Sequence, residues 1–232
     1  MSNYLFTNFP YSNPPVAYKA CDFMTDEDLT EFVATAISSG SASVIDTDVY
    51  GCARLTAAAT TDDSGVEVQR DAAWIALATS KRIRYETRVR LGESTSTDMP
   101  TQCDFFAGIA TLDTSIIASA PTNGIYFRKD DGDDYLDIVI RTGGSDVAAV
   151  TAVASLSKDV WYRLSIDIQM DSSSGVGAVT FYLDGTAKYS ATFASGLPAS
   201  TSMMAEFVAF QSGNALGTKY LDVDYIVAEV QR

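Results

Sequence analysis

The chain has 232 residues, of which 47% are hydrophobic and 20% charged, so it can bury a core and is not a disordered polymer. Its formal net charge of −14 argues against nucleic acid and anionic membranes as partners, because both require a basic surface. It has no histidine, which excludes histidine-dependent catalysis. The wide spacing of its three cysteines, Cys21, Cys52 and Cys103, indicates neither a disulfide framework nor a zinc site, and we expect no cofactor.

The first residues form an arm of unusual composition. Half of the six prolines lie in residues 1–15, together with the aromatic residues Tyr4, Phe6, Phe9 and Tyr11. Prolines prevent a helix here, and the aromatic side chains need a surface to cover them. We therefore expect residues 1–31 to form an extended arm that either wraps on its own domain or docks on a partner. The start of the chain also lacks the pattern of a secretory signal, so we expect synthesis in a cytoplasm.

The segment that follows the arm allows two interpretations. Thr25 with Asp28 three residues later loosely fits a capped helix over residues 25–36. However, Val33, Thr35 and Ile37 are mostly β-branched, which favours a strand over residues 31–37.

Period-two alternation is the main signal in the rest of the chain. Apolar residues alternate with polar ones in four long runs, which predicts strands with one face on a core and the other toward water. The predicted inward residues are Ile83, Tyr85, Thr87, Val89 and Leu91; Tyr162, Leu164, Ile166, Ile168 and Met170; Val179, Phe181 and Leu183; and Leu221, Val223, Tyr225 and Val227.

Turn signals separate these runs. Asn123-Gly124, Asp131-Gly132 and Gly143-Gly144 mark turns, and Asp184-Gly185 predicts a tight hairpin before residues 187–193. We count ten to twelve candidate strands. The sequence therefore predicts an all-β protein, a two-sheet antiparallel jelly-roll sandwich over residues 32–232 that follows the arm.

A basic stripe stands out in this acidic chain. Five of the sixteen basic residues lie within ten positions: Lys81, Arg82, Arg84, Arg88 and Arg90. Such a strand face can contact an acidic partner or a neighbouring copy. It can equally pair with acidic residues of an adjacent strand.

Two acidic groups are candidates for chemistry. The run Asp130–Asp134 could supply oxygen ligands to Ca²⁺, but its Asp-Gly pair between two strands favours an ordinary turn. Asp222 and Asp224 lie two residues apart on one strand, a spacing that paired carboxylates could use for glycoside hydrolysis. No third carboxylate follows in phase, because position 226 is isoleucine, so we favour a solvated strand face.

Two aromatic residues are candidates for sugar binding. By the alternation, Trp161 and Tyr182 face outward, where such side chains can stack on sugars or line a protein interface. Trp161 at the start of a strand could also simply cover an edge of the core.

The order of motifs from Phe105 onward resembles a known family. The segments WYRL at residues 161–164, FYLDG at residues 181–185 and LDVDYI at residues 221–226 carry the likeness. They resemble concanavalin A-like (laminin-G-like) jelly-roll domains of tailed-phage structural proteins, most closely head decoration, or cement, proteins. The likeness covers about residues 32 to 232.

The resemblance implies a non-enzymatic virion protein on the outer surface of the capsid. Its partner would be the major capsid protein, and it would assemble as a homo-oligomer, with a trimer as one arrangement. In this hypothesis the arm anchors the protein to the shell. The alternative is a carbohydrate-binding, lectin-like module of a phage tail or fibre, because the same sandwich serves several functions.

Overall fold

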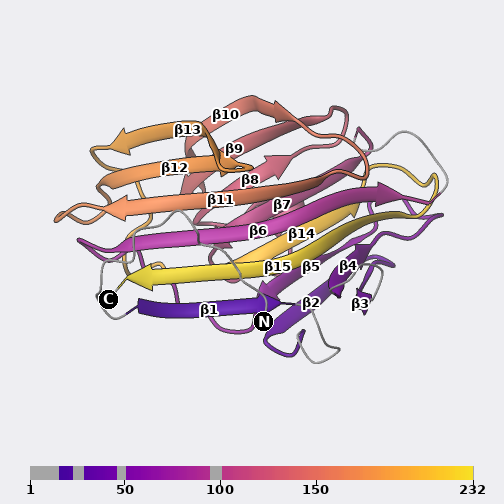
Figure 1. Ribbon diagram of the computed structural model, residues 1–232, viewed down its shortest axis with the longest axis horizontal. Coiled ribbons are helices and arrows are strands. Elements are labelled where there is room, and N and C mark those ends of the chain that lie inside the picture. Colours follow the sequence, from indigo (N-terminus) through magenta and orange to yellow (C-terminus); the bar gives the residue numbers. More distant parts are fainter. Residues whose placement is uncertain (1–15, 23–28, 46–50, 95–100, 232) are drawn as a thin grey trace.

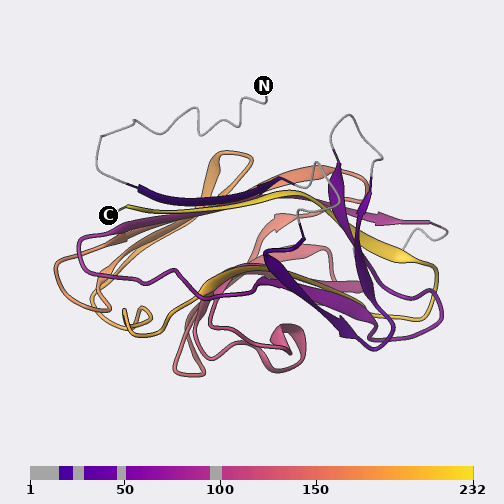
Figure 2. The same ribbon diagram turned by 90° about the horizontal axis from the view of Figure 1, so that it is seen from below.

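The computed structural model describes residues 16–22, 29–45, 51–94 and 101–231. It confirms an all-β jelly-roll sandwich of two antiparallel sheets packed face to face, with fifteen strands in the described ranges (Figures 1 and 2). Sheet A runs in the order β13 (Thr186–Phe193), β12 (Gly177–Leu183), β11 (Trp161–Met170), β6 (Arg82–Glu93), β15 (Lys219–Gln231), β4 (Cys52–Thr56) and β3 (Ser41–Ile45). Sheet B runs in the order β10 (Ser145–Ser155), β9 (Tyr135–Thr142), β8 (Gly124–Lys129), β7 (Cys103–Ala110), β14 (Ala205–Ser212), β5 (Gly65–Arg70) and β2 (Phe32–Ile37).

Part of the expected arm belongs to the sandwich. Strand β1 (Val16–Asp22) pairs antiparallel with the second half of β15, from Tyr225 to Gln231. The first half of β15 pairs on the same side with β4. These seven residues of the expected arm therefore lie along the sandwich, and their backbone hydrogen bonds extend sheet A.

The main core lies between the sheets and follows the predicted alternation closely. The inward residues of β6, β11 and β12 are buried there, including Ile83, Leu164 and Phe181. Phe127 of sheet B meets Phe181 of sheet A edge to face, with ring centroids 5.1 Å apart. Because the period of a strand is two, the sequence alone identified this face.

The last strand departs from the prediction in its second half. A register shift between Val223 and Tyr225 inserts an extra residue into β15 against β6. Tyr225 consequently faces outward and donates a hydrogen bond to Glu86 (2.7 Å), while Ile226 and Ala228 join the core. The predicted inward position of Tyr225 and Val227 is wrong, because a bulge reverses the faces.

The predicted hairpins are confirmed. Asp184 and Gly185 have φ values of 50° and 80° between β12 and β13. Gly143 and Gly144, with 60° and 82°, connect β9 to β10 in the same way. Two successive positive φ values match the right-handed twist of the flanking strands.

A second, smaller apolar cluster covers the outer face of sheet B. It contains Phe106, Tyr126, Val139 and Phe207, and Ile116 packs on them from the loop at residues 111–123. This loop carries the short helix α1 (Ile116–Ser119), which lies outside sheet B in Figure 2. The loop therefore buries outward-facing side chains of the sheet and forms one wall of the site described next.

Candidate functional site

A cavity of about 400 Å³ opens on sheet B where β2 and β5 meet the 111–123 loop. We call it the Glu67 pocket. Val66 and Val68 of β5 point into the main core, so Glu67 and Gln69 between and beyond them point to the outer face. The lining residues include Thr35, Glu67, Gln69, Arg70, Asp71, Leu112, Asp113 and Thr114.

Glu67 has a buried carboxyl group, and only one of its two oxygens accepts a hydrogen bond in the described structure. Only 2% of the residue is exposed. Its Oε1 accepts a hydrogen bond from the backbone N–H of Ile117 (2.9 Å), whereas Oε2 is buried and has no hydrogen-bond partner in the described structure. Burial raises the pKa of Glu67 above its ordinary value, although the N–H groups of Ile117 and Ile116 oppose the shift.

Gln69 fixes the loop that forms the pocket wall. Its Nε2 donates to the carbonyl of Thr111 (3.3 Å), and its Oε1 accepts from the backbone N–H of Asp113 (2.9 Å). Asp113 Oδ1 in turn accepts from the backbone N–H of Ser115 (3.0 Å). The wall is therefore held in place by the sheet rather than by a ligand.

Arg70 also lines the pocket and leaves one donor without a partner. Its Nε donates to both carboxylate oxygens of the buried Glu206 (3.1 Å each), and Nη1 pairs with Glu31. Trp74 Nε1 donates to the same Glu206 (2.7 Å). Arg70 Nη2 is buried and has no hydrogen-bond partner in the described structure. Glu67 and Arg70 thus both line the pocket, and each has one buried side-chain atom without a hydrogen-bond partner in the described structure, but the side chain of Arg70 lies with Glu206 and the ring of Phe32, on the inner side of sheet B.

The basic stripe lies on the outer face of sheet A and pairs with acidic residues of the neighbouring strands. Arg82 pairs with Asp167 of β11, and Arg84 lies 4.0 Å from the same carboxylate and 3.9 Å from Glu229 of β15. Arg88 pairs with Asp224 (3.0 Å) and Arg90 with Asp222 (2.8 Å). The structure therefore shows the stripe pairing with acidic residues of adjacent strands, which was one of the two alternatives. Contact of the stripe with a partner protein stays a prediction.

Asp222 and Asp224 are ion-pair partners with different surroundings. Asp222 is fully buried and accepts from Arg54 Nε (2.6 Å) as well as from Arg90. Its hydrogen bond raises the pKa of Arg54. The expectation of a solvated face is wrong for Asp222, because Arg54 and Arg90 from the two flanking strands cover its carboxylate.

Trp161 and Tyr182 face outward on sheet A, as predicted, and the structure places them away from the Glu67 pocket on sheet B. The guanidinium groups of Arg88 and Arg90 lie 4.8 and 4.7 Å from the centre of the Trp161 ring. These cation–π contacts already use the ring in joining β6 to β11.

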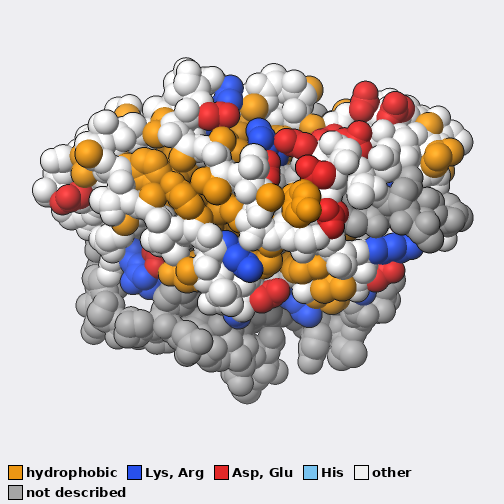
Figure 3. All heavy atoms as spheres, turned by 90° about the horizontal axis from the view of Figure 1, so that it is seen from above, with side chains coloured by type: hydrophobic (Ala, Val, Ile, Leu, Met, Phe, Trp, Pro, Cys, Tyr) orange, Lys and Arg blue, Asp and Glu red, His pale blue; other side chains and the backbone are white. Residues whose placement is uncertain are grey.

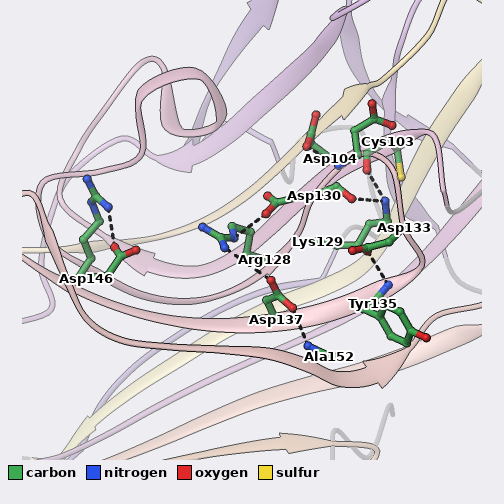
Figure 4. A network of polar contacts seen from close by, with 12 residues as sticks. Cys103, Asp104, Arg128, Lys129, Asp130, Asp133, Tyr135, Asp137, Asp146 and Ala152 are labelled. Carbon is green, nitrogen blue, oxygen red and sulfur yellow. Dashed lines mark hydrogen bonds and ion pairs between the residues drawn. The ribbon is translucent and has the colours of Figure 1, made fainter.

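The acidic run Asp130–Asp134 forms the turn between β8 and β9 (Figure 4). Asp133 Oδ1 accepts from the backbone N–H of Tyr135 (2.9 Å), and Asp130 pairs with Arg128 (3.1 Å). Gly132 has a φ of +100°. The turn interpretation is confirmed, and the described residues contain no group of three or more potential metal ligands.

Some predicted site residues lie outside the described part of the chain, and the sequence did not predict two residues of the pocket. Tyr4, Phe6, Phe9 and Tyr11 lie outside the described residues. Cys103 is buried, and burial raises the pKa of its thiol to about 12, so it is not a nucleophile at neutral pH. Sequence reasoning missed Glu67 and Gln69. Their alternation with Val66 and Val68 signalled only an outward face, and nothing local showed that a distant loop would cover it.

Comparisons with known proteins identify the fold. No family model and no curated protein matches the chain. The carbohydrate recognition domain of Emp47p superposes with a TM-score of 0.63 at 11% identity, covering 90% of this chain and 93% of that domain. A protein of unknown function from Shewanella oneidensis MR-1 gives 0.62 at 14% identity, covering 97% and 91%. A carbohydrate esterase from the Shiga toxin-encoding bacteriophage phi24B gives 0.57 at 16% identity, covering 94% and 100%.

At these identities the likeness shows the fold alone, a lectin-like jelly-roll sandwich. The solved neighbours include both a binding domain and an enzyme, so the fold does not choose between these classes. In the part of the chain that the structure describes, none of the helices has the length and apolar character to cross a bilayer.

Proposed function

We propose that this protein binds carbohydrate, without cleaving it, in the Glu67 pocket. The observation that carries the proposal is the buried carboxyl group of Glu67, a residue that lines this pocket, whose Oε2 has no hydrogen-bond partner in the described structure. A hydroxyl group both donates and accepts hydrogen bonds. A sugar hydroxyl can therefore donate to the Glu67 carboxylate and accept from another polar group of the pocket, which a purely anionic ligand cannot do.

The form and fold of the site support this class of ligand. A pocket of about 400 Å³ lies within the size range of small-molecule sites. The wall is preorganised by Gln69, which lowers the entropic cost of binding. Neighbours of the same fold include a carbohydrate recognition domain and a phage carbohydrate esterase.

A glycan array followed by calorimetry of the best ligand tests this proposal. We expect Glu67→Gln to weaken binding by at least about tenfold, because a hydrogen bond to a charged group contributes about 1.5–3 kcal/mol. Trp161→Ala, on the opposite sheet, is the matched control and should bind as the wild type does. Absence of binding to any glycan contradicts the proposal. Loss of binding in Trp161→Ala alone would move the sugar site to sheet A, and release of shorter sugars would make the protein an enzyme.

A second candidate function is capsid decoration, which the outer face of sheet A favours. This face presents Trp161, Arg88 and a Tyr220 ring stacked under Arg54 at 3.7 Å, and tryptophan, tyrosine and arginine are the residue types that dominate protein interfaces. The side chain of Arg88 is 44% exposed. Residues 1–15 precede β1, which forms part of the same sheet.

Deletion of residues 1–15 tests the decoration hypothesis. If the arm anchors the protein on major capsid protein, the deletion should abolish binding to assembled shells while the sandwich keeps its far-ultraviolet circular dichroism. Arg88→Ala should weaken shell binding if sheet A is the contact face. Normal decoration by both variants would contradict the hypothesis.

A further inference from the structure

The inward face of sheet A ends in two polar residues where β6 finishes and β15 begins. Leu91 of β6 and Leu221 of β15 belong to the main core. Because side chains alternate along a strand, the residues two positions away, Glu93 and Lys219, point inward as well. The two are partners in the antiparallel register. The strands therefore place a carboxyl group and an amine side by side between the sheets.

Lys219 and Glu93 are shielded from water, unlike most charged side chains of the molecule. Both side chains have an exposed fraction of 0%, and Lys219 Nζ lies 3.7 Å from Glu93 Oε1. On the face drawn in Figure 3, by contrast, acidic side chains gather at the surface toward one end, where water stabilises their charge. An interior ammonium group is costly even when it has a partner. A reaction that transfers the charge of Lys219 into water is therefore favoured by these surroundings.

The amine of Lys219 contacts the side-chain amide of Asn214, five residues earlier in the chain. Nζ lies 2.5 Å from Asn214 Oδ1, which also accepts a hydrogen bond from the backbone N–H of Leu216 (3.0 Å). Asn214 Nδ2 donates to Gln102 Oε1 (3.0 Å), so the contacts fix which end of the amide is the carbonyl. Since a C=O bond measures about 1.2 Å, the carbonyl carbon is at most about 3.7 Å from Nζ. This is close to the distance of about 3–3.5 Å from which bonds form.

We propose that Lys219 and Asn214 join in an isopeptide bond, with Glu93 carrying protons between them. Glu93 accepts a proton from Nζ, and the lone pair of the resulting amine forms a bond to Asn214 Cγ. The N–H of Leu216 stabilises the negative charge that develops on Oδ1. Glu93 passes protons from Nζ to Nδ2, the Cγ–Nδ2 bond breaks, and the nitrogen leaves as ammonium. Overall, a primary amide and an alkylammonium group give a secondary amide and ammonium, so the step needs no oxidant and no cofactor.

The bond would fasten a corner where the chain passes from one sheet to the other. Strand β14 ends at Ser212 in sheet B, and β15 begins at Lys219 in sheet A. The bond closes the loop between these strands. Because this loop is short, closing it removes little entropy from the unfolded chain. We therefore expect its main effect on local opening of the corner rather than on global stability.

A second buried lysine provides an internal comparison. Lys129 of β8 is also 0% exposed, but its Nζ donates to the backbone carbonyls of Cys103 (2.6 Å) and Asp130 (2.7 Å) (Figure 4). In the described ranges, no side-chain amide is among the hydrogen-bond partners of this amine. We therefore expect Lys129 to stay an amine, so burial of a lysine alone does not lead to the reaction.

Mass spectrometry of the full chain tests the bond. We expect the purified protein to be lighter than its sequence requires by one ammonia molecule. Trypsin should leave residues 189–232 as a single peptide, because acylation removes the charge of Lys219 that trypsin recognises. The tandem spectrum of this peptide should lack backbone fragments between Asn214 and Lys219. Lys219→Met and Glu93→Gln should each have the mass of their sequence, whereas the control Lys129→Met should keep the loss of ammonia.

A wild-type mass equal to that of the sequence would overturn the inference. Loss of ammonia that persists in Lys219→Met would overturn it too, because Asn214 would then have cyclised on its own backbone to a succinimide. Complete bond formation in Glu93→Gln would contradict the role given to Glu93. Circular dichroism checks that the variants fold, and if one does not, the mass and tandem spectrum of the wild type still decide whether the bond exists.

Discussion

Glu67 occupies a position that costs stability and that a ligand would use. Its buried carboxyl group has a raised pKa, so the folded state holds the proton more tightly than the unfolded chain does. Folding is therefore less favourable wherever Glu67 is ionised, and its contribution to stability falls as pH rises from the ordinary pKa of 4.5 through the raised folded value.

Replacement of Glu67 by glutamine should separate stability from binding. Glutamine keeps an acceptor for the Ile117 N–H but carries no charge, so we expect Glu67→Gln to unfold at a higher temperature than the wild type at pH 7. The difference should shrink as pH falls below 4.5, where both side chains are neutral. Thermal unfolding of both proteins, measured from pH 7 to below pH 4.5, gives this difference in unfolding temperature. A variant that is less stable at pH 7 would show that the carboxylate has a structural role instead.

Asp222 should contribute more to stability than Asp224, although they are two residues apart. The Asp222 carboxylate is fully buried between Arg54 and Arg90, whereas Asp224 pairs with an Arg88 side chain that is 44% exposed. We expect Asp222→Asn to lower the free energy of unfolding by about 2–3 kcal/mol. Asp224→Asn should cost less than about 1 kcal/mol. Urea denaturation checks both, and equal losses would contradict the assignment.

At the scale of the element, the turn between β12 and β13 depends on its glycine. Gly185 has a φ of +80°, and a Cβ added there would lie 2.9 Å from Arg163 Nη2. Gly144 has nearly the same φ, +82°, with nothing within 4 Å of an added Cβ. We expect Gly144→Ala to cost about 1–2 kcal/mol from backbone strain alone. Gly185→Ala should cost slightly more, because Arg163 must also move, and chemical denaturation of the two variants measures the difference.

At the scale of the whole molecule, the formal net charge of −14 should oppose self-association at low salt. The screening length falls from about 30 Å at 0.01 M salt to about 10 Å at 0.1 M. We therefore expect any association between copies of this chain to strengthen as salt rises over this range, because salt screens the repulsion between them. Sedimentation velocity at several salt concentrations measures the trend. Dissociation on adding salt would instead indicate a contact made by ion pairs.

The sequence by itself determined the fold class, most of the core and the hairpins. These features follow local rules: period-two alternation assigns Ile83 or Phe181 to the inner face, and Asp184-Gly185 selects its turn from two residues. The sequence also showed the basic stripe, but it did not show which groups the arginines contact. Whether it met a partner or its own sheet depended on which strands flank β6.

Only the tertiary structure decided which polar groups are paired and which remain unpaired. Arg54 and Asp222 are 168 positions apart in the sequence, so no local pattern joins them. The bulge near Asp224 reversed the faces of β15, because one extra residue shifts the phase of every residue after it. The loop at residues 111–123 turned an outward Glu67 into a buried one and so created the pocket. Burial and pairing of this kind depend on contacts between distant segments, and the site therefore became visible only in the folded chain.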